Sequence, residues 1–161
     1  MTPPPIAIVT GGSRGIGRAI VACLVRDGFA VLFTHSHSDA EVAEVEAAFP
    51  GRARALRVDV ADPGAAAAIF DAAAALGPVA ALVNNAGVAG RLGRFADLAD
   101  DDLDRVVAVN LVAVARLCRE AARRLTAGAI VNVSSVAART GSPHEYVAYA
   151  ATKAAVETLS R

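Results

Sequence analysis

Tryptophan is absent from this sequence, and it contains only one methionine, two cysteines and one lysine. Two cysteines are too few for a disulfide framework. Cys23 and Cys118 each lie in an apolar helical segment, without the CxxC or histidine spacing of a metal or redox site. We therefore expect two reduced core thiols and no bound metal.

Other absences exclude whole classes of partner. Sixteen basic residues balance sixteen acidic ones, so no net charge attracts the chain to nucleic acid or to a membrane surface. The first residues lack the basic and apolar regions of a signal peptide, and Asp71 interrupts the most apolar stretch. We expect a cytoplasmic protein that binds neither nucleic acid nor membranes.

Five short apolar runs alternate with five longer helical segments. The expected strands are residues 6–10, 30–34, 55–60, 79–85 and 129–135, and the expected helices are residues 17–28, 39–49, 63–77, 101–125 and 145–161. Strands that are apolar on both faces are typical of a parallel sheet covered by helices on each side. The sequence predicts a single domain over residues 1–161 with an α/β, Rossmann-type doubly wound parallel sheet.

A glycine-rich turn follows the first expected strand. Gly11, Gly15 and Gly17 form a G-x-x-x-G-x-G pattern at the start of the first helix. Glycine lets the backbone approach a pyrophosphate closely, and the turn amides and the helix N-terminus hold its charge. This pattern directly after a strand favours dinucleotide binding over an ordinary loop.

The end of the second expected strand carries no acidic residue to bind a free ribose hydroxyl. The first carboxylate beyond it, Asp39, is better explained as the cap of the next helix. Arg14 in the glycine turn could receive a 2′-phosphate together with His35, Ser36 and His37. Each histidine alone is better explained as a solvated loop residue, but the whole segment favours NADP over NAD.

Polar residues also follow the third and fourth expected strands. Asp59 and Val60 end the third strand, where an adenine could pack and form hydrogen bonds. Asn85, Ala86 and Gly87 end the fourth, at the sheet edge where such folds bind ligands. The second group can equally be a polar turn that ties strands together.

Asn110 and Ser135 are polar residues whose positions alone do not decide their roles. Asn110 interrupts an apolar helix, which indicates either a local distortion or a polar group needed inside. Ser134 and Ser135 end the fifth expected strand, where serines are usually turn formers.

The only lysine, Lys153, follows Tyr149 by four residues. Residues at this spacing share a helix face, so the ammonium can lie near the phenol and favour its ionised form. Such a tyrosine is usable as a general acid near neutral pH. Tyr146 has Ala150 at the same spacing and lacks this partner.

Together these motifs resemble the short-chain dehydrogenase/reductase family. The resemblance rests on "TGGSRGIG" from Thr10, "NNAG" from Asn84, Asn110, Ser135 and "YAATK" from Tyr149, in family order and at family-like separations. The phrases around Ser135 and Tyr149 look most like members described as 3-oxoacyl-carrier-protein-reductase-like or glucose-dehydrogenase-like. The resemblance implies an NADP-dependent oxidoreductase that interconverts a small-molecule carbonyl and an alcohol.

The resemblance also implies roles for matching residues. Tyr149 would exchange a proton with the substrate oxygen, Ser135 would orient that oxygen, and Lys153 would bind the nicotinamide ribose. Asn110 would hold a water that links Lys153 to solvent. The residues implied to contact the cofactor are Gly11, Ser13, Arg14, Gly15, Ile16, Ser36, Asp59, Val60, Asn85, Ala86, Gly87, Tyr149 and Lys153. The long helices imply a homo-oligomer, a dimer or tetramer.

Two departures from the family pattern qualify these expectations. The segment between Ser135 and Tyr149 is one residue longer than in many members, which a loop absorbs. Arg161 falls inside a helical pattern, and the family's further strands and substrate lid have no counterpart. We expect the N-terminal part of a longer enzyme. The alternatives are a truncated or degenerate NADP-binding module without turnover, and a piece that does not fold alone.

Overall fold

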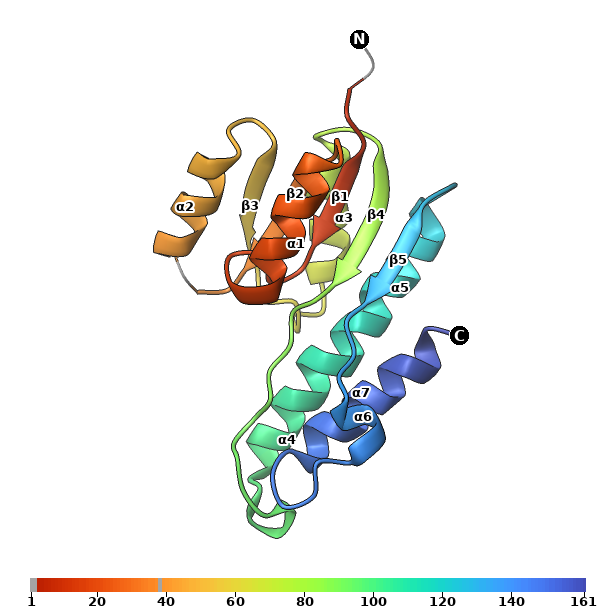
Figure 1. The fold of residues 1–161 in the computed structure, drawn as a ribbon. Coiled ribbons are helices and arrows are strands. Elements are labelled where there is room, and N and C mark those ends of the chain that lie inside the picture. The colour runs from red at the N-terminus through yellow and green to blue at the C-terminus, as the bar shows by residue number, and fades with distance from the viewer. Residues whose placement is uncertain (1–2, 38) are drawn as a thin grey trace.

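A five-stranded parallel sheet forms the centre of the computed structural model, which describes residues 3–37 and 39–161. The strands are β1 (Ile6–Val9), β2 (Ala30–His35), β3 (Ala53–Arg57), β4 (Val79–Asn84) and β5 (Ala129–Asn132). Their order in the sheet is β3-β2-β1-β4-β5, and all four neighbouring pairs are parallel (Figure 1). The predicted Rossmann-type α/β fold is confirmed.

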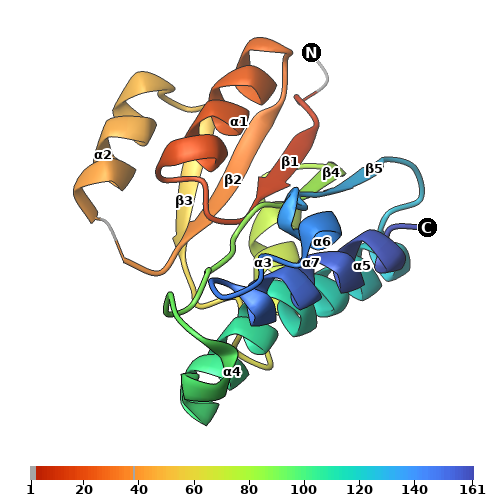
Figure 2. The same cartoon turned by 60° about the horizontal axis from the view of Figure 1, so that its bottom comes forward.

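Helices cover both faces of this sheet. They are α1 (Gly15–Arg26), α2 (Asp39–Ala48), α3 (Ala65–Ala74), α4 (Asp100–Val107), a π-helical segment η2 (Ala108–Val112), α5 (Ala113–Arg124), α6 (Ala137–Thr140) and α7 (Val147–Leu159), with a short 3₁₀ turn η1 (Phe95–Asp97). In Figure 2, α1 and α2 lie on one side of the strands and α3 and α5 on the other. α7 packs against α4 and η2.

The two layers explain why the strand sequences are apolar throughout. Successive side chains of a strand point to opposite faces. Ile6 and Ile8 of β1 pack in the cluster that includes Phe70 of α3. Ala7 and Val9 pack in the other cluster, on the side of α1 and α2. Because both faces are covered, no position of β1 is left for a polar side chain.

Several predicted boundaries are wrong. β3 comprises residues 53–57 rather than 55–60, because its pairing with β2 ends where His35 meets Arg57. Asp59 therefore lies beyond the sheet rather than inside a strand. Asp39 does not precede α2 but is its first residue, and its carboxylate lies 3.7 Å from Arg57. Ser38, which precedes Asp39, lies outside the described residues.

Both cysteines are free thiols, but the core location predicted for Cys23 is wrong. Cys23 is exposed on α1, and only Cys118 is partly buried. Burial raises the pKa of Cys118, against the opposing effect of hydrogen bonds with Asn132 and Asn84. In the part of the chain that the structure describes, no helix is long and apolar enough to cross a membrane.

Candidate functional site

The glycine-rich turn joins β1 to α1 at the carboxyl edge of the sheet. Gly11 and Gly15 adopt φ angles of +68° and +53°, which favour glycine. A Cβ on Gly17 would overlap the carbonyl oxygen of Gly11, whereas the space around Gly15 is open. α1 begins here without a side-chain cap, so its first amides are available to an anion. This cradle fits a dinucleotide pyrophosphate.

Thr10 and Asn85 tie this turn to the end of β4. The Thr10 hydroxyl accepts hydrogen bonds from the amides of Asn85 and Ala86, each at 3.0 Å. The Asn85 side chain donates to the carbonyls of Thr10 at 2.9 Å and Gly11 at 3.0 Å. The Asn85 amide therefore serves as a structural tie between strands. The sequence argument did not single out Thr10, although it belongs to the same motif.

A cleft of about 350 Å³ lies beside this turn. β1 has β2 on one side and β4 on the other, so the cleft lies where the strand order reverses, the usual ligand position in such folds. All the expected cofactor contacts except Tyr149 and Lys153 line it: Gly11, Ser13, Arg14, Gly15, Ile16, Ser36, Asp59, Val60, Asn85, Ala86 and Gly87. The fold thus brings residues from four strand ends into one cleft.

The segment after β2 forms one rim of the cleft. Ser36 and His37 are exposed, and the Ser36 hydroxyl lies 3.0 Å from Nδ1 of His37. His35 is buried, and its Nδ1 has no hydrogen-bond partner among the described residues. Asp59 is the only carboxylate among the described lining residues. Among the described lining residues, the segment at the end of β2 therefore contributes no carboxylate to the cleft.

Asp59 is held in place by a pair of contacts. Its Oδ1 accepts a hydrogen bond from the amide of Ala61 at 3.0 Å, and its Oδ2 lies 2.8 Å from Nη1 of Arg105. Burial alone would raise the pKa of Asp59, but Ala61, Arg105 and the charge of His37 together hold it below its usual value. Arg105 also lines the cleft, and sequence reasoning missed it because nothing distinguishes it from the other fourteen arginines.

Asn110 lies fully buried in the π-helical segment η2. Its Oδ1 accepts from the amide of Val88 and its Nδ2 donates to the carbonyl of Val88, both at 2.8 Å. Nδ2 also donates to Thr152 Oγ1 of α7 at 3.3 Å. Both possibilities raised by the sequence hold: the helix is locally distorted, and the polar group is used inside. Single π turns of this kind occur frequently at functional sites.

Lys153 is also buried, with 4% of its surface exposed. Its Nζ donates to the carbonyl of Val133 at 2.6 Å and lies 5.7 Å from the centre of the Tyr149 ring. Burial lowers the pKa of Lys153. A Cβ built on Gly87 would lie 3.7 Å from this Nζ and 3.3 Å from Asn110 Oδ1, so both side chains border Gly87.

The two serines after β5 differ in their contacts. The Ser134 hydroxyl donates to Glu157 at 3.1 Å, which ties β5 to α7. The Ser135 Oγ accepts from the amide of Ala137 at 3.2 Å, in the first turn of α6. α6 packs against α7, so Ser135 and Tyr149 lie on neighbouring segments (Figure 1).

Comparison with known proteins agrees with this geometry. A family profile described as short chain dehydrogenase matches residues 5–161. An uncharacterized oxidoreductase of Escherichia coli is 42% identical over 96% of this chain and 67% of its own length. A 3beta-hydroxysteroid dehydrogenase of Mediterraneibacter gnavus is 36% identical over 97% of this chain and 58% of its own length.

Solved structures show the same relationship. A short-chain dehydrogenase/reductase double mutant of Serratia marcescens superposes with a TM-score of 0.90 at 38% identity, covering 98% of this chain and 66% of that one. A blue fluorescent protein from a metagenomic library, in complex with NADPH, superposes with a TM-score of 0.85 at 35% identity. The alignment again covers 98% of this chain and 66% of that one. The chain spans about two thirds of the length of these structures. It belongs to the short-chain dehydrogenase/reductase family.

Proposed function

We propose that this chain carries the cofactor site and catalytic groups of an NADP-dependent oxidoreductase that interconverts a carbonyl and an alcohol. The observation that carries the proposal is that Lys153 and Asn110 both border Gly87, which lines the cleft, with Tyr149 on the same helix as Lys153. The cofactor, when bound, supplies hydride transfer.

The protein's own groups then handle the proton. Tyr149 passes a proton to or from the substrate oxygen, and Ser135 donates a hydrogen bond that orients this oxygen. The Lys153 ammonium lies 5.7 Å from the centre of the Tyr149 ring and binds a ribose hydroxyl of the cofactor. Asn110 Oδ1 retains acceptor capacity beyond its bond to Val88. We assign to it a water that connects Lys153 with solvent.

The preference for NADP rests on the charge at the rim of the cleft. Arg14 in the glycine turn is exposed, as are Ser36 and His37, and all three line the cleft. A phosphate there gains charge-assisted hydrogen bonds from a guanidinium and meets no carboxylate from the end of β2. Arg14→Ala should weaken NADPH binding about tenfold and leave NADH binding unchanged within about twofold. Equal losses for both cofactors would contradict the assignment.

The partner expected besides the substrate is a second copy of the chain. An apolar groove of about 230 Å³ runs between α4, η2 and α7, lined by Leu103, Val107, Leu111 and Ala151 among others. A dimer that buries this groove would remove from water apolar side chains that are otherwise half-buried. Sedimentation analysis of the wild type and of Leu111→Glu tests this proposal.

The decisive experiment follows NADPH oxidation with a panel of ketones. Tyr149→Phe should abolish carbonyl-dependent oxidation while its NADPH dissociation constant stays within about twofold of the wild type. Thr158→Val, at the exposed end of the same helix, serves as the matched control and should retain turnover. Retained turnover in Tyr149→Phe would refute the catalytic assignment.

A cofactor-binding module without turnover is the second candidate. The cleft favours it, because eleven of the expected cofactor contacts line the cleft without a contribution from Tyr149 or Lys153. NADPH protection against thermal unfolding, without oxidation by any ketone in the panel, would select this candidate. Broad, uncooperative unfolding would instead indicate that the piece does not fold alone.

A further inference from the structure

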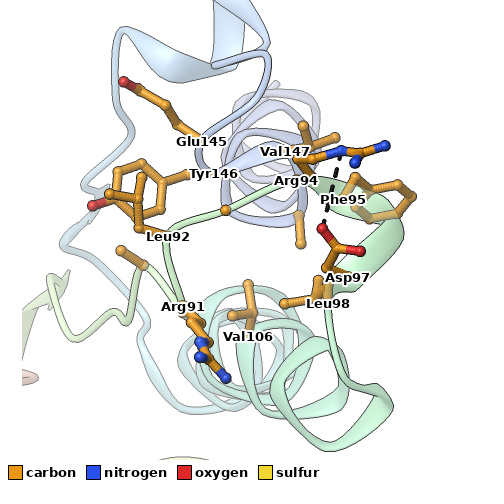
Figure 3. Close-up of a pocket in the computed structure, with 14 residues that line it drawn as sticks. Arg91, Leu92, Arg94, Phe95, Asp97, Leu98, Val106, Glu145, Tyr146 and Val147 are labelled. Atoms are coloured by element: carbon orange, nitrogen blue, oxygen red, sulfur yellow. Dashed lines mark ion pairs between the residues drawn. The ribbon is translucent and has the colours of Figure 1, made fainter.

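A second pocket of about 270 Å³ lies between the loop of residues 89–98 and the first turn of α7. Apolar side chains supply much of its wall (Figure 3): Leu92, Phe95, Leu98, Val106 and Val147, with the ring of Tyr146. Its other lining residues are glycines and alanines of the same segments and four charged side chains. Concave sites of this composition are the usual binding places for small molecules.

This pocket adjoins the cofactor cleft along two segments. On the loop after β4, Val88 lines the cleft and the next residue, Ala89, lines the pocket. On α4, Arg105 lines the cleft and the next residue, Val106, lines the pocket. The pocket and the cleft therefore border the same two segments of the chain.

The pocket also lies next to the proposed proton donor. Tyr146 forms its wall, and the Tyr146 and Tyr149 rings contact each other edge to face with centres 6.5 Å apart. Tyr146 thus contacts both the pocket and the tyrosine to which the carbonyl oxygen must bind. A substrate with its oxygen at Tyr149 can place the rest of its body against Tyr146.

The exposure of the apolar wall indicates an apolar occupant. Leu92 is 60% exposed and Phe95 is 55% exposed, although both line the same concave site. Single exposed apolar residues are normal, but two large ones at one pocket gain stability when a ligand removes them from water. A hydrocarbon group bound in the pocket would remove both side chains from water.

The charged side chains around the pocket cancel one another. Two arginines, Arg91 and Arg94, are matched by Asp97 and Glu145. Figure 3 shows Arg94 beside Asp97, with Nε and Oδ2 4.0 Å apart. A ligand carboxylate or ammonium would therefore meet no net complementary charge. An uncharged ligand loses no binding free energy through this balance of charges.

We propose that this pocket selects uncharged carbonyl compounds and alcohols with a compact apolar body of about one ring. An apolar cavity of roughly 150 Å³ accepts benzene, so about 270 Å³ admits a single substituted ring. The proposal rests on the proposed function, because it assumes that the reacting oxygen binds at Tyr149. Leu92 and Phe95 are then specificity-determining residues.

Amide chemical shifts test the pocket without requiring turnover. The NADP-saturated chain and the cofactor-free chain are titrated with cyclohexanone, with 4-oxocyclohexanecarboxylate and with hydroxyacetone. Cyclohexanone should shift the amides of residues 89–98 and 145–148, with an affinity about tenfold higher than those of the charged ring and the small polar ketone. Leu92→Asp should weaken cyclohexanone binding about tenfold, whereas Leu159→Asp, a similarly exposed leucine at the far end of α7, should not.

The outcomes separate the two proposals. Shifts that are absent or centred elsewhere, or equal affinity for the carboxylate, would overturn the substrate class. NADPH oxidation with hydroxyacetone and no cyclohexanone binding would overturn it while the proposed function survives. Cyclohexanone binding at the pocket without any NADPH oxidation would support the binding class and refute the proposed function.

Discussion

Replacing Asn110 by leucine should destabilise the chain more than any other change at a single polar side chain in the site. The substitution keeps the size of the side chain but leaves the amide and the carbonyl of Val88 without their 2.8 Å partners. Each unpaired group costs about 1–3 kcal/mol, and the lower half of this range applies because Val88 is only half-buried. We expect a loss of about 2–4 kcal/mol in the free energy of unfolding. For a chain of this length the melting temperature then falls by roughly 4–16 °C.

Urea denaturation followed by far-UV circular dichroism measures this loss. Thr152→Val is the matched control, because it removes the longer bond to Asn110 and the Thr152 bond to the Tyr149 carbonyl but leaves Val88 paired. For this control we expect a loss of about 0.5–1.5 kcal/mol in the free energy of unfolding. A change of less than about 0.5 kcal/mol for Asn110→Leu, with an unaltered denaturant slope, would refute the reasoning.

Three further changes test other parts of the site. Gly17→Ala should abolish NADPH binding measured by calorimetry, because the added Cβ overlaps the backbone of the glycine turn. At Gly15 the added Cβ meets open space, so Gly15→Ala should lower the free energy of unfolding only by about 1–2 kcal/mol, through backbone strain. Arg105→Met should lower the free energy of unfolding by under about 1 kcal/mol at pH 7, because the pair is partly exposed. Since Arg105 lowers the pKa of Asp59, this difference should vanish as the pH falls below the ordinary value of 3.8. Burial lowers the pKa of Lys153, so the cost of its charge is present at neutral pH and disappears as the pH rises through the ordinary value of 10.5. The stability of the wild type should therefore rise relative to Lys153→Met as the pH approaches and passes 10.5, and a constant difference would contradict the burial argument.

The motif residues could be predicted because each motif is local. The glycine turn and the Tyr149–Lys153 pair depend on spacings of a few residues, which a helix or a turn converts directly into geometry. The end of β3 could not be predicted, because pairing with β2 rather than apolar content decides where the strand stops. Cys23 was misplaced for a related reason: an apolar neighbourhood in sequence does not say which side of a helix faces solvent.

By itself, the sequence determined the parallel α/β fold, since apolar runs that alternate with helical segments have few other ways to be buried. It also determined which residue types reach the carboxyl edge of the sheet. Only the tertiary structure decided the partners of Asp59 and Asn110 and the pocket beside Tyr146. These features join the segment after β3 to α4, η2 to the loop after β4, and that loop to α7. Contacts between distant segments depend on how the helices pack on the sheet, and no local pattern encodes that packing.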